Sequence, residues 1–317
     1  MDFAAALLLV PARDWSASTW SLFLVVAIIW GLNYIFVNIG LAFSSPLWLA
    51  ALRAVFGLVG SAGILAVIGG GGKLDRRGKR DAVLIGLPNI TVFFACWFLA
   101  AGRILPGVAA VTIYTFPLWV ALLSAPVLHQ RLTARHWASV TVGFLGIVLV
   151  SQIGEFTGTR LPLVPIVELL VAAFAWAMAT VVIQRRFRPS EMLEANVYQL
   201  VGGTGGLLVL ALVAAPSALP EVTQPELWAT VLWLGVLGTA IAYSVWFYLL
   251  GRTRAATLSA YLFLVPVVAF AASAVVFGER LTYLQLVGVL CVLASIYGIG
   301  RAPGNSDSDG VPEARPT

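Results

Sequence analysis

Two ionisable residues, Arg53 and Glu168, lie inside stretches of the chain that are otherwise apolar enough to be buried in a membrane. A charge at the centre of a membrane-spanning helix costs about 2.5 to 3.5 kcal/mol or more, so each needs a chemical reason. Arg53 lies about seven residues, or about 10 Å along a helix, from the outer end of its stretch. Glu168 lies about five residues from the outer end of its own stretch. We therefore expect the two charges at similar depths.

At that depth the two charges are placed to act on a substrate. We expect both residues to face a watery outward cavity, where they either pair with each other or bind the carboxylate and the ammonium group of a substrate. The alternatives are structural: Glu168 extends to the outer lipid headgroups, and Arg53 bonds the end of a helix.

A stripe of polar and aromatic residues is the second candidate feature. Trp30, Asn33, Tyr34, Val37 and Asn38 follow i, i+3, i+4 spacing, which puts them on one face of a helix. Amide side chains that faced lipid would be unpaired, so this face is predicted to contact protein or water.

The same combination of amides and rings recurs further along the chain. The residues concerned are Asn89, Phe93, Cys96 and Trp97, then Thr239, Tyr243, Trp246 and Phe247, and also Tyr114, Trp176, Gln199 and Tyr261. Together with the stripe they are predicted to wall a largely apolar cavity with a few amides, which suits amino acids with large side chains. The alternative is that they pack and hydrogen-bond between helices.

Three prolines inside apolar stretches are predicted to act as hinges: Pro88, Pro117 and Pro266. Each lacks a backbone N–H and leaves a carbonyl that a cavity or a neighbouring helix can use. Static kinks are the alternative. The glycines of the Gly202-Gly203 and Gly205-Gly206 pairs are predicted to let a neighbouring helix approach closely.

Catalytic and metal chemistry is not predicted. The two histidines, His129 and His136, are predicted to lie in one connection between apolar stretches, which leaves no intramembrane Ser-His pair or histidine metal site. The Gly-rich loop before Lys73 lacks the Ser or Thr that follows the lysine of a phosphate-binding loop. We expect no enzyme activity, no catalytic residue, no bound metal, no cofactor and no ATP-driven transport by this chain.

The elements that must position these residues are membrane helices. Of 317 residues, 60% are hydrophobic and 10% charged, and the mean hydropathy is +0.96. A helix needs about 20 apolar residues to cross the hydrocarbon of a bilayer. The predicted spans cover residues 17–39, 46–68, 82–101, 105–127, 135–153, 163–184, 193–215, 227–250, 255–277 and 281–300.

The basic residues predict an orientation for these spans. If the N-terminus is cytoplasmic, only Arg103, Arg160 and Arg280 fall outside, while Arg53 is inside a span and the other basic residues fall on the cytoplasmic side. This bias is the positive-inside rule. It places both termini in the cytoplasm of an inner (plasma) membrane, and it assigns the net charge of +5 to orientation in the lipid bilayer, with no nucleic-acid partner.

The chain contains an internal repeat. A shift of 149 positions superposes the segment from Gly86 to Ser151, without gaps, on the segment from Gly235 to Gly300. Pro117 then falls on Pro266, and a weaker match at a shift of 146 sets Arg53 on Gln199. An odd number of spans separates equivalent helices, so the two halves face opposite ways. We predict an all-α integral membrane protein of ten transmembrane helices, built as two inverted five-helix repeats, which is the build of a secondary transporter.

The predicted domain organisation follows the repeat. It comprises an N-terminal cytoplasmic tail (1–16), a first five-helix repeat (17–153), a periplasmic linker (154–162), a second five-helix repeat (163–301) and a disordered cytoplasmic tail (302–317). The sequence predicts no oligomeric state, and a monomer is compatible with it.

Several stretches resemble the drug/metabolite transporter (DMT) superfamily of the EamA type. They are Trp30 to Tyr34 (WGLNY), Arg53 within ALRAVFG, the TFPLWVALL run around Pro117, Leu237 to Tyr243 (LGTAIAY) and Leu264 to Thr282. Within that superfamily, the abundance of aromatic residues is similar to that of the YddG-type aromatic amino-acid exporters.

This resemblance implies a secondary transporter that exports amino acids, including aromatic ones, and related small metabolites by alternating access. The resemblance alone supplies the outward direction, and the sequence leaves proton coupling and facilitated diffusion both open. Two alternatives remain: a translocase of lipid-linked carriers, which would enter from the bilayer, and a broad metabolite or drug effluxer.

Overall fold

The computed structural model describes residues 17–68, 73–104, 106–130, 132–150, 162–277 and 282–300. The predicted tails 1–16 and 302–317 and most of the predicted linker 154–162 lie outside the described residues, as do Arg160 and Arg280. Throughout the described ranges the secondary structure is helical, without a strand.

The first half of the chain runs from α2 to α8. Its third helix is a continuous rod in which the π-helical segment η1 joins α4 to α5. The bounds are α2 (Ala17–Leu41), α3 (Pro46–Ile68), α4 (Arg76–Gly86), η1 (Leu87–Val92), α5 (Phe93–Ala101), α6 (Pro106–Ile113), α7 (Phe116–Leu128) and α8 (Ala134–Val150).

The second half follows the same order. A short 3-10 turn, η3 (Pro189–Glu191), precedes α10, and a second π-helical segment, η4, joins α11 to α12. The bounds are α9 (Leu163–Arg186), α10 (Met192–Ala214), α11 (Pro225–Leu232), η4 (Trp233–Ile241), α12 (Ala242–Leu250), α13 (Ala255–Tyr261), α14 (Leu264–Phe277) and α15 (Tyr283–Gly300).

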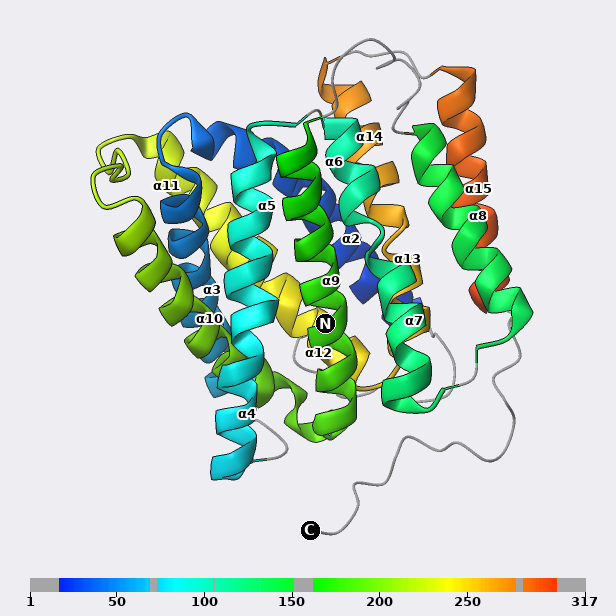
Figure 1. Cartoon of the computed structure of the whole chain (residues 1–317), viewed down its shortest axis with the longest axis horizontal. Coiled ribbons are helices and arrows are strands. Elements are labelled where there is room, and N and C mark those ends of the chain that lie inside the picture. The colour runs from blue at the N-terminus through cyan, green and yellow to red at the C-terminus, as the bar shows by residue number, and fades with distance from the viewer. Residues whose placement is uncertain are drawn as a thin grey trace.

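The helix starts recur at the spacing found in the sequence. The starts of α2 and α3, at residues 17 and 46, correspond to those of α9 and α10, at 163 and 192. The starts of α4, α6 and α8, at residues 76, 106 and 134, correspond to those of α11, α13 and α15, at 225, 255 and 283. Figure 1 shows α4 below α5 but α11 above α12, so the two rods run in opposite directions.

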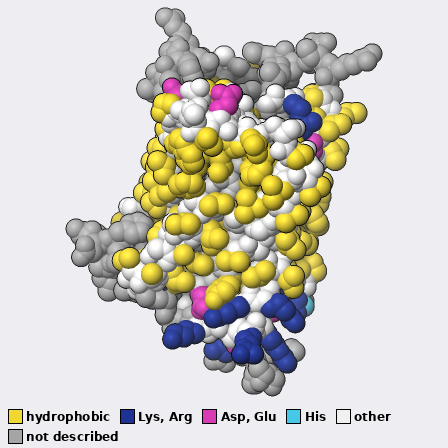
Figure 2. All heavy atoms as spheres, turned by 90° about the vertical axis from the view of Figure 1, so that its left-hand side faces the viewer, with side chains coloured by type: hydrophobic (Ala, Val, Ile, Leu, Met, Phe, Trp, Pro, Cys, Tyr) yellow, Lys and Arg dark blue, Asp and Glu magenta, His cyan; other side chains and the backbone are white. Residues whose placement is uncertain are grey.

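The molecule is a multi-pass membrane bundle. Seven described helices or rods are long and apolar enough to cross a membrane, and three shorter apolar helices accompany them, at Ala134–Val150, Ala255–Ala271 and Tyr283–Ile299. Figure 2 shows a band of hydrophobic side chains between two ends that carry the charged ones. The predicted spans 105–127 and 255–277 are each divided by a turn, into α6 and α7 and into α13 and α14.

Both rods change to π-helix at the same point of the repeat. The segment Leu87–Val92 corresponds to residues 236–241, which lie within η4. The segment η1 contains Pro88, which has no N–H to donate to the preceding turn, whereas η4 contains no proline. A π segment leaves backbone carbonyls without their usual partner and is frequent at functional sites.

Each rod is crossed at its π segment by a helix of the other half, and glycine makes the crossing possible. A Cβ added to Gly57 of α3 would lie 2.4 Å from Thr239 Cγ2 of η4. A Cβ added to Gly203 of α10 would lie 2.2 Å from Ile90 Cβ of η1. Gly202 and Gly206 make similarly close approaches, as predicted, whereas Gly205 faces open space. Each of these crossings joins one half of the chain to the other.

Helices α8 and α15 form a pair at one side of the bundle (Figure 1). The backbones meet at Gly146 and Gly288, and the Ser295 hydroxyl donates to the carbonyl of Ser139 at 2.6 Å. Much of α15 is exposed, including Tyr283 and Tyr297. An exposed apolar face of a membrane helix faces lipid, so this pair needs no further cover.

Candidate functional site

A cluster of aromatic rings occupies the centre of the bundle around Trp176 of α9. Phe116 stacks on Trp176 with ring centroids 3.8 Å apart, and Phe93 lies at 5.0 Å. Trp30 of α2 lies 5.6 Å from Trp176, and Trp246 of α12 lies 5.9 Å from it. The cluster brings together side chains from both halves.

The cluster is connected to the second π segment. Trp30 contacts Tyr243 and Trp246 at 5.7 Å each, and its indole N–H donates to the carbonyl of Gly238 at 3.0 Å. Gly238 lies within η4, where the widened helix leaves carbonyls free for such bonds. Asn33 lies on the same helix as Trp30 and is only 3% exposed. Its side-chain oxygen accepts a hydrogen bond from the Trp233 indole at 3.2 Å. Trp30 and Asn33 of the predicted stripe therefore face protein. For Asn38 the prediction is wrong: its side chain is exposed and donates to the Tyr34 carbonyl of the same helix at 2.9 Å.

Arg53 lies beside this cluster and is 2% exposed. Its Nε donates to the Thr239 hydroxyl at 3.0 Å, and its Nη2 donates to the Gly238 carbonyl at 3.4 Å. The guanidinium carbon lies 4.2 Å from the ring centroid of Phe94 and 5.6 Å from that of Trp97. Nη1 has no partner among the described residues.

The described partners of the Arg53 guanidinium are thus all neutral. A contact between a cation and a ring contributes about 0.5 to 2 kcal/mol, and a hydrogen bond to a charged group about 1.5 to 3 kcal/mol. Such contacts offset part of the cost of burying the charge, but they leave the charge itself uncompensated. The site therefore carries a positive field in an apolar surrounding.

A relay of amide side chains lies at the other crossing. Asn89 of η1 donates to Gln199 of α10, Gln199 donates to Asn196 Oδ1 at 3.0 Å, and Asn196 donates to Ser244 Oγ at 3.5 Å. Asn89, Asn196 and Gln199 are each no more than 1% exposed. The relay starts at Asn89, whose Oδ1 has no described partner. It therefore offers one free acceptor.

The arginine site and the amide relay occupy equivalent places in the repeat. A shift of 146 sets Arg53 on Gln199, and a shift of 149 sets Asn89 on Gly238. Arg53 bonds Gly238, and Gln199 bonds Asn89, so the same pair of positions is in contact twice. One contact carries a charge and the other carries only amides.

Glu168 does not pair with Arg53, and that alternative is wrong. Glu168 accepts instead from Arg103 at 2.5 Å, near the exposed end of α9 where α5 ends. The reason is topological: α9 packs along α5, α6 and α7, whereas α3, which carries Arg53, packs on η4 and α10. Arg103 also donates to the Leu99 carbonyl at 2.6 Å. Glu168 belongs to a peripheral ion pair.

Three other tyrosines that the sequence predicted for the cavity lie in different places relative to the ring cluster. Tyr34 packs against the small apolar group that contains Ala100, Ile104 and Leu169, and its buried hydroxyl has no described partner. Tyr114 forms the turn between α6 and α7 and is half-buried. Tyr261 packs instead on Trp20, with centroids 5.1 Å apart, and on Phe23. The structure does not bring Tyr261 into the ring cluster.

The predicted hinge prolines all lie at irregular points of helices. Pro88 starts η1. Pro117 lies in the first turn of α7, directly after the turn at residues 114–115, and Pro266 lies in the first turn of α14, after the turn at residues 262–263. A proline is tolerated in a first turn because its missing N–H is not needed there. The breaks that precede Pro117 and Pro266 occur at equivalent places in the two halves.

Several residues of the site were missed by the sequence analysis. They are Phe94, Phe116, Asn196, Gly238 and Ser244. Asn196 precedes Gln199 by three residues, so helical spacing alone places both on one face. Phe116 directly precedes Pro117, but nothing in its spacing indicates that it stacks on Trp176.

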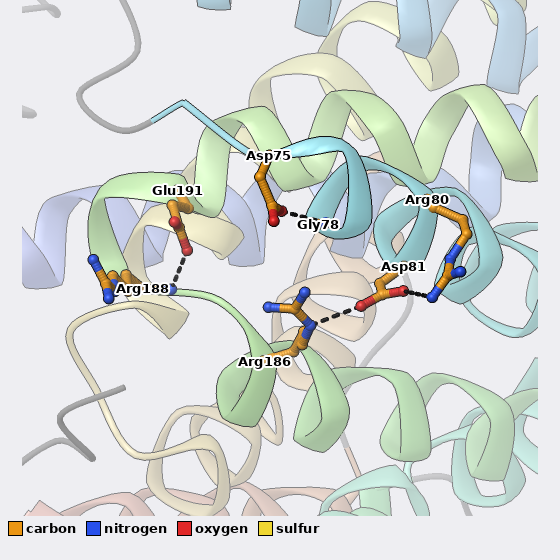
Figure 3. Close-up of polar contacts among 7 residues, drawn as sticks. All are labelled: Asp75, Gly78, Arg80, Asp81, Arg186, Arg188 and Glu191. Carbon is orange, nitrogen blue, oxygen red and sulfur yellow. Dashed lines mark hydrogen bonds and ion pairs between the residues drawn. The ribbon is translucent and has the colours of Figure 1, made fainter. Parts of the chain in front are cut away.

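Ion pairs connect the helices at the Arg-rich end of the bundle. Figure 3 shows Asp81 of α4 between Arg186, which ends α9, at 2.8 Å and its neighbour Arg80 at 3.3 Å. In the same view Asp75 caps α4 by accepting from the Gly78 N–H. Lys79 lies 3.6 Å from Glu194 of α10. These pairs attach α4 to both neighbours from the second half.

The described residues contain no group of three or more His, Cys, Asp or Glu side chains able to hold a metal ion. Cys96 and Cys291 are free and half-buried. His129 ends α7 in the left-handed conformation (φ 54°), and His136 lies buried in the first turn of α8 instead of in the connection. The groups that the structure brings together at the site are the Arg53 guanidinium, the amides of the relay and the aromatic rings.

Comparison with known proteins gives consistent matches over most of the chain. The profile of the EamA-like transporter family matches residues 18–152 and again residues 164–301. A probable amino-acid metabolite efflux pump of Salmonella typhimurium is 28% identical over 285 residues, covering 86% of this chain and 92% of that protein. Protein PecM of Dickeya dadantii is 30% identical over 276 residues, covering 84% and 87%.

A solved crystal structure shares the fold. It superposes with a TM-score of 0.72 at 18% identity, covering 89% of this chain and 96% of the other. At that identity the likeness concerns the arrangement of the helices alone.

Proposed function

Because the chain belongs to the EamA-like transporter family of the drug/metabolite transporter superfamily, we propose that it exports amino acids, including aromatic ones, and related small carboxylate metabolites by alternating access. Family membership makes it a membrane transporter and not an enzyme. The name of the Salmonella typhimurium relative, an amino-acid metabolite efflux pump, supports the substrate class and the outward direction.

The observation that carries the proposal is Arg53. A buried guanidinium with a free Nη1, beside a cluster of large rings, suits a substrate that has a carboxylate at one end and an apolar or aromatic body. In this assignment Arg53 binds the carboxylate. Trp30, Phe93, Trp97, Trp176, Tyr243 and Trp246 surround the body of the substrate, and Asn33, Asn89 and Gln199 supply neutral polar contacts.

The proposed mechanism uses ten helices arranged as two inverted five-helix repeats. Equivalent helix starts and the opposite directions of the two rods support this arrangement. In such transporters the site lies at the interface of the repeats, and rocking of one half against the other exposes it to each side in turn. The π segments and the turns before Pro117 and Pro266 are the places where the helices bend.

The proposed orientation puts the Arg-rich end of α4 in the cytoplasm of a bacterial-type inner membrane. Arg76, Arg77, Lys79 and Arg80 lie on α4, and Arg185 and Arg186 end α9. Figure 2 shows basic side chains gathered at this end. The positive-inside rule assigns such an end to the cytoplasm, together with both termini.

Uptake into proteoliposomes tests the function. We expect radiolabelled phenylalanine to enter vesicles that contain the protein faster than empty vesicles, and we expect Arg53→Ala to abolish the difference. Vesicles with Glu168→Gln serve as the matched control, because that change removes a charge outside the proposed site. Equal uptake by the wild type and Arg53→Ala would contradict the role of Arg53.

A further inference from the structure

The candidate site has a buried positive charge, Arg53, but no buried negative charge among the described residues. This difference indicates which substrates the site can bind. A free amino acid carries a carboxylate and an ammonium group, and a site that binds it inside a membrane has to compensate both. The described structure offers Arg53 for the carboxylate. The partner that the ammonium group would need is a buried acid.

Among the residues that the structure describes, the three candidate positions for such an acid are neutral or already engaged. Asn89 ends the relay with a free amide oxygen, which accepts a hydrogen bond but carries no charge. Gln199, the repeat equivalent of Arg53, is an amide bonded on both sides. Glu168 is held by Arg103 at the end of α5.

The buried arginine already lacks a counter-charge. Its contacts are a hydroxyl, a carbonyl and rings. A substrate with one carboxylate and no ammonium group neutralises Arg53 on binding. A zwitterion neutralises it too, but it brings a second charge that finds only rings and an amide oxygen, and such contacts do not repay the loss of water around an ammonium group.

We infer that the site prefers singly negative aromatic carboxylates that lack an ammonium group, such as 2-hydroxy or 2-keto acids, over zwitterionic amino acids, because the contacts of Arg53 among the described residues are all neutral. The inference rests on the proposed function, because it assumes that Arg53 binds the carboxylate and that Asn89 contacts the substrate.

The wild-type protein can be tested with three probes that share one ring. L-phenyllactate has a hydroxyl where L-phenylalanine has its ammonium group, and phenethylamine keeps the ammonium group but lacks the carboxylate. In proteoliposome uptake we expect a half-saturation concentration about tenfold or more lower for phenyllactate than for phenylalanine, and no uptake of phenethylamine.

Asn89→Asp provides the reciprocal test. The new carboxylate would compensate an ammonium group and repel an anion, so the ratio of phenyllactate to phenylalanine uptake should fall by about tenfold or more. Asn89→Leu is the matched control: it removes the same amide but adds no charge, so the ratio should still favour phenyllactate. If Asn89→Asp does not fold, the three wild-type probes decide alone.

The outcomes separate this inference from the proposed function. Uptake of phenylalanine equal to or better than that of phenyllactate overturns the inference and leaves the proposed amino-acid export intact. Uptake of phenethylamine alone overturns the role of Arg53. Uptake of none of the three probes contradicts the proposed function, and the inference falls with it.

Discussion

The α3–η4 crossing and the α10–η1 crossing have the same backbone design and different chemistry. In both, a glycine lets one helix meet the π segment of the other half at a distance that excludes any side chain. The first crossing buries Arg53 against Gly238 and Thr239. The second buries Gln199 against Asn89 and Asn196.

The comparison distinguishes the features that join the two halves from the features that would bind a substrate. Close packing is required twice, because each crossing joins one half to the other, and so glycine is present in both. Charge is present once. A second buried charge would add several kcal/mol of desolvation, whereas a neutral amide relay occupies the equivalent positions at lower cost. The symmetric part of the structure is the packing, and the asymmetric part is the site.

We expect the largest effect on stability from replacing the glycine that each crossing contains. Gly57→Leu and Gly203→Leu should each prevent stable folding, because the new side chain collides with Thr239 or Ile90, and overpacking in a dense core costs about 1 to 3 kcal/mol or more. Thermal unfolding in detergent measures both. Gly205→Leu, which points into open space on the same helix as Gly203, is the control and should be tolerated. A stable Gly57→Leu protein beside an unstable Gly203→Leu protein would break the comparison.

The next prediction contrasts the polar residues at the two equivalent positions. Arg53→Met should lower kcat/KM for a carboxylate substrate by about 10- to 150-fold, because a hydrogen bond to a charged group contributes about 1.5 to 3 kcal/mol. The same change should leave the melting temperature equal or raise it, since it removes an uncompensated buried charge.

At the α10–η1 crossing we expect the opposite: a substitution there should lower stability more than it lowers transport. Gln199→Leu leaves Asn89 and Asn196 without their partner, so we expect a loss of about 1 to 3 kcal/mol of stability and a smaller effect on transport. Unfolding and uptake measured on the same preparations compare the two variants. An Arg53→Met protein that transports normally, or a Gln199→Leu protein with unchanged stability, would contradict the division of roles.

Arg53→Lys sharpens the assignment of the charge. Lysine keeps the positive charge but not the planar fork that bonds Thr239 and Gly238 while leaving Nη1 free. We expect transport to persist with a half-saturation concentration raised by about tenfold, the equivalent of about one charge-assisted hydrogen bond. Loss of all transport would show that the geometry of the fork matters more than its charge.

The smallest expected effect lies outside both crossings. Arg103 is 46% exposed in its ion pair with Glu168, and exposed pairs contribute about 0 to 1 kcal/mol. A double-mutant cycle of Arg103→Gln and Glu168→Gln should give a coupling below about 1 kcal/mol that decreases with salt. Transport should change by no more than about twofold. A strong loss of transport in Glu168→Gln would contradict this prediction and would indicate that Glu168 takes part in substrate binding.

The sequence predicted the parts of this structure that depend on patterns along the chain. Helical spacing placed Trp30 and Asn33 on one protein-facing side, and the repeat set Arg53 and Gln199 in equivalent positions. The cost of a charge in a membrane identified Arg53 before any contact was visible. Family-level transport function followed from the same motifs.

The rest depended on which helices become neighbours. The sequence predicted Glu168 and Arg53 at similar depths, but depth carries no information on direction around a helix bundle, and Glu168 pairs with Arg103 instead. The π segments were not predictable from hydropathy, because they change the hydrogen-bond pattern and leave the composition unchanged. The stacking of Phe116 on Trp176 likewise joins residues from different halves.

The contact between Arg53 and Thr239 has a consequence for synthesis of the chain. The two residues are 186 positions apart. At about 5 to 20 residues per second, the ribosome makes the partner of the buried arginine roughly 10 to 40 s after the arginine itself. During that interval the first half cannot close on its own, so we expect the insertion machinery or nearby lipid headgroups to shelter the guanidinium until the second half arrives.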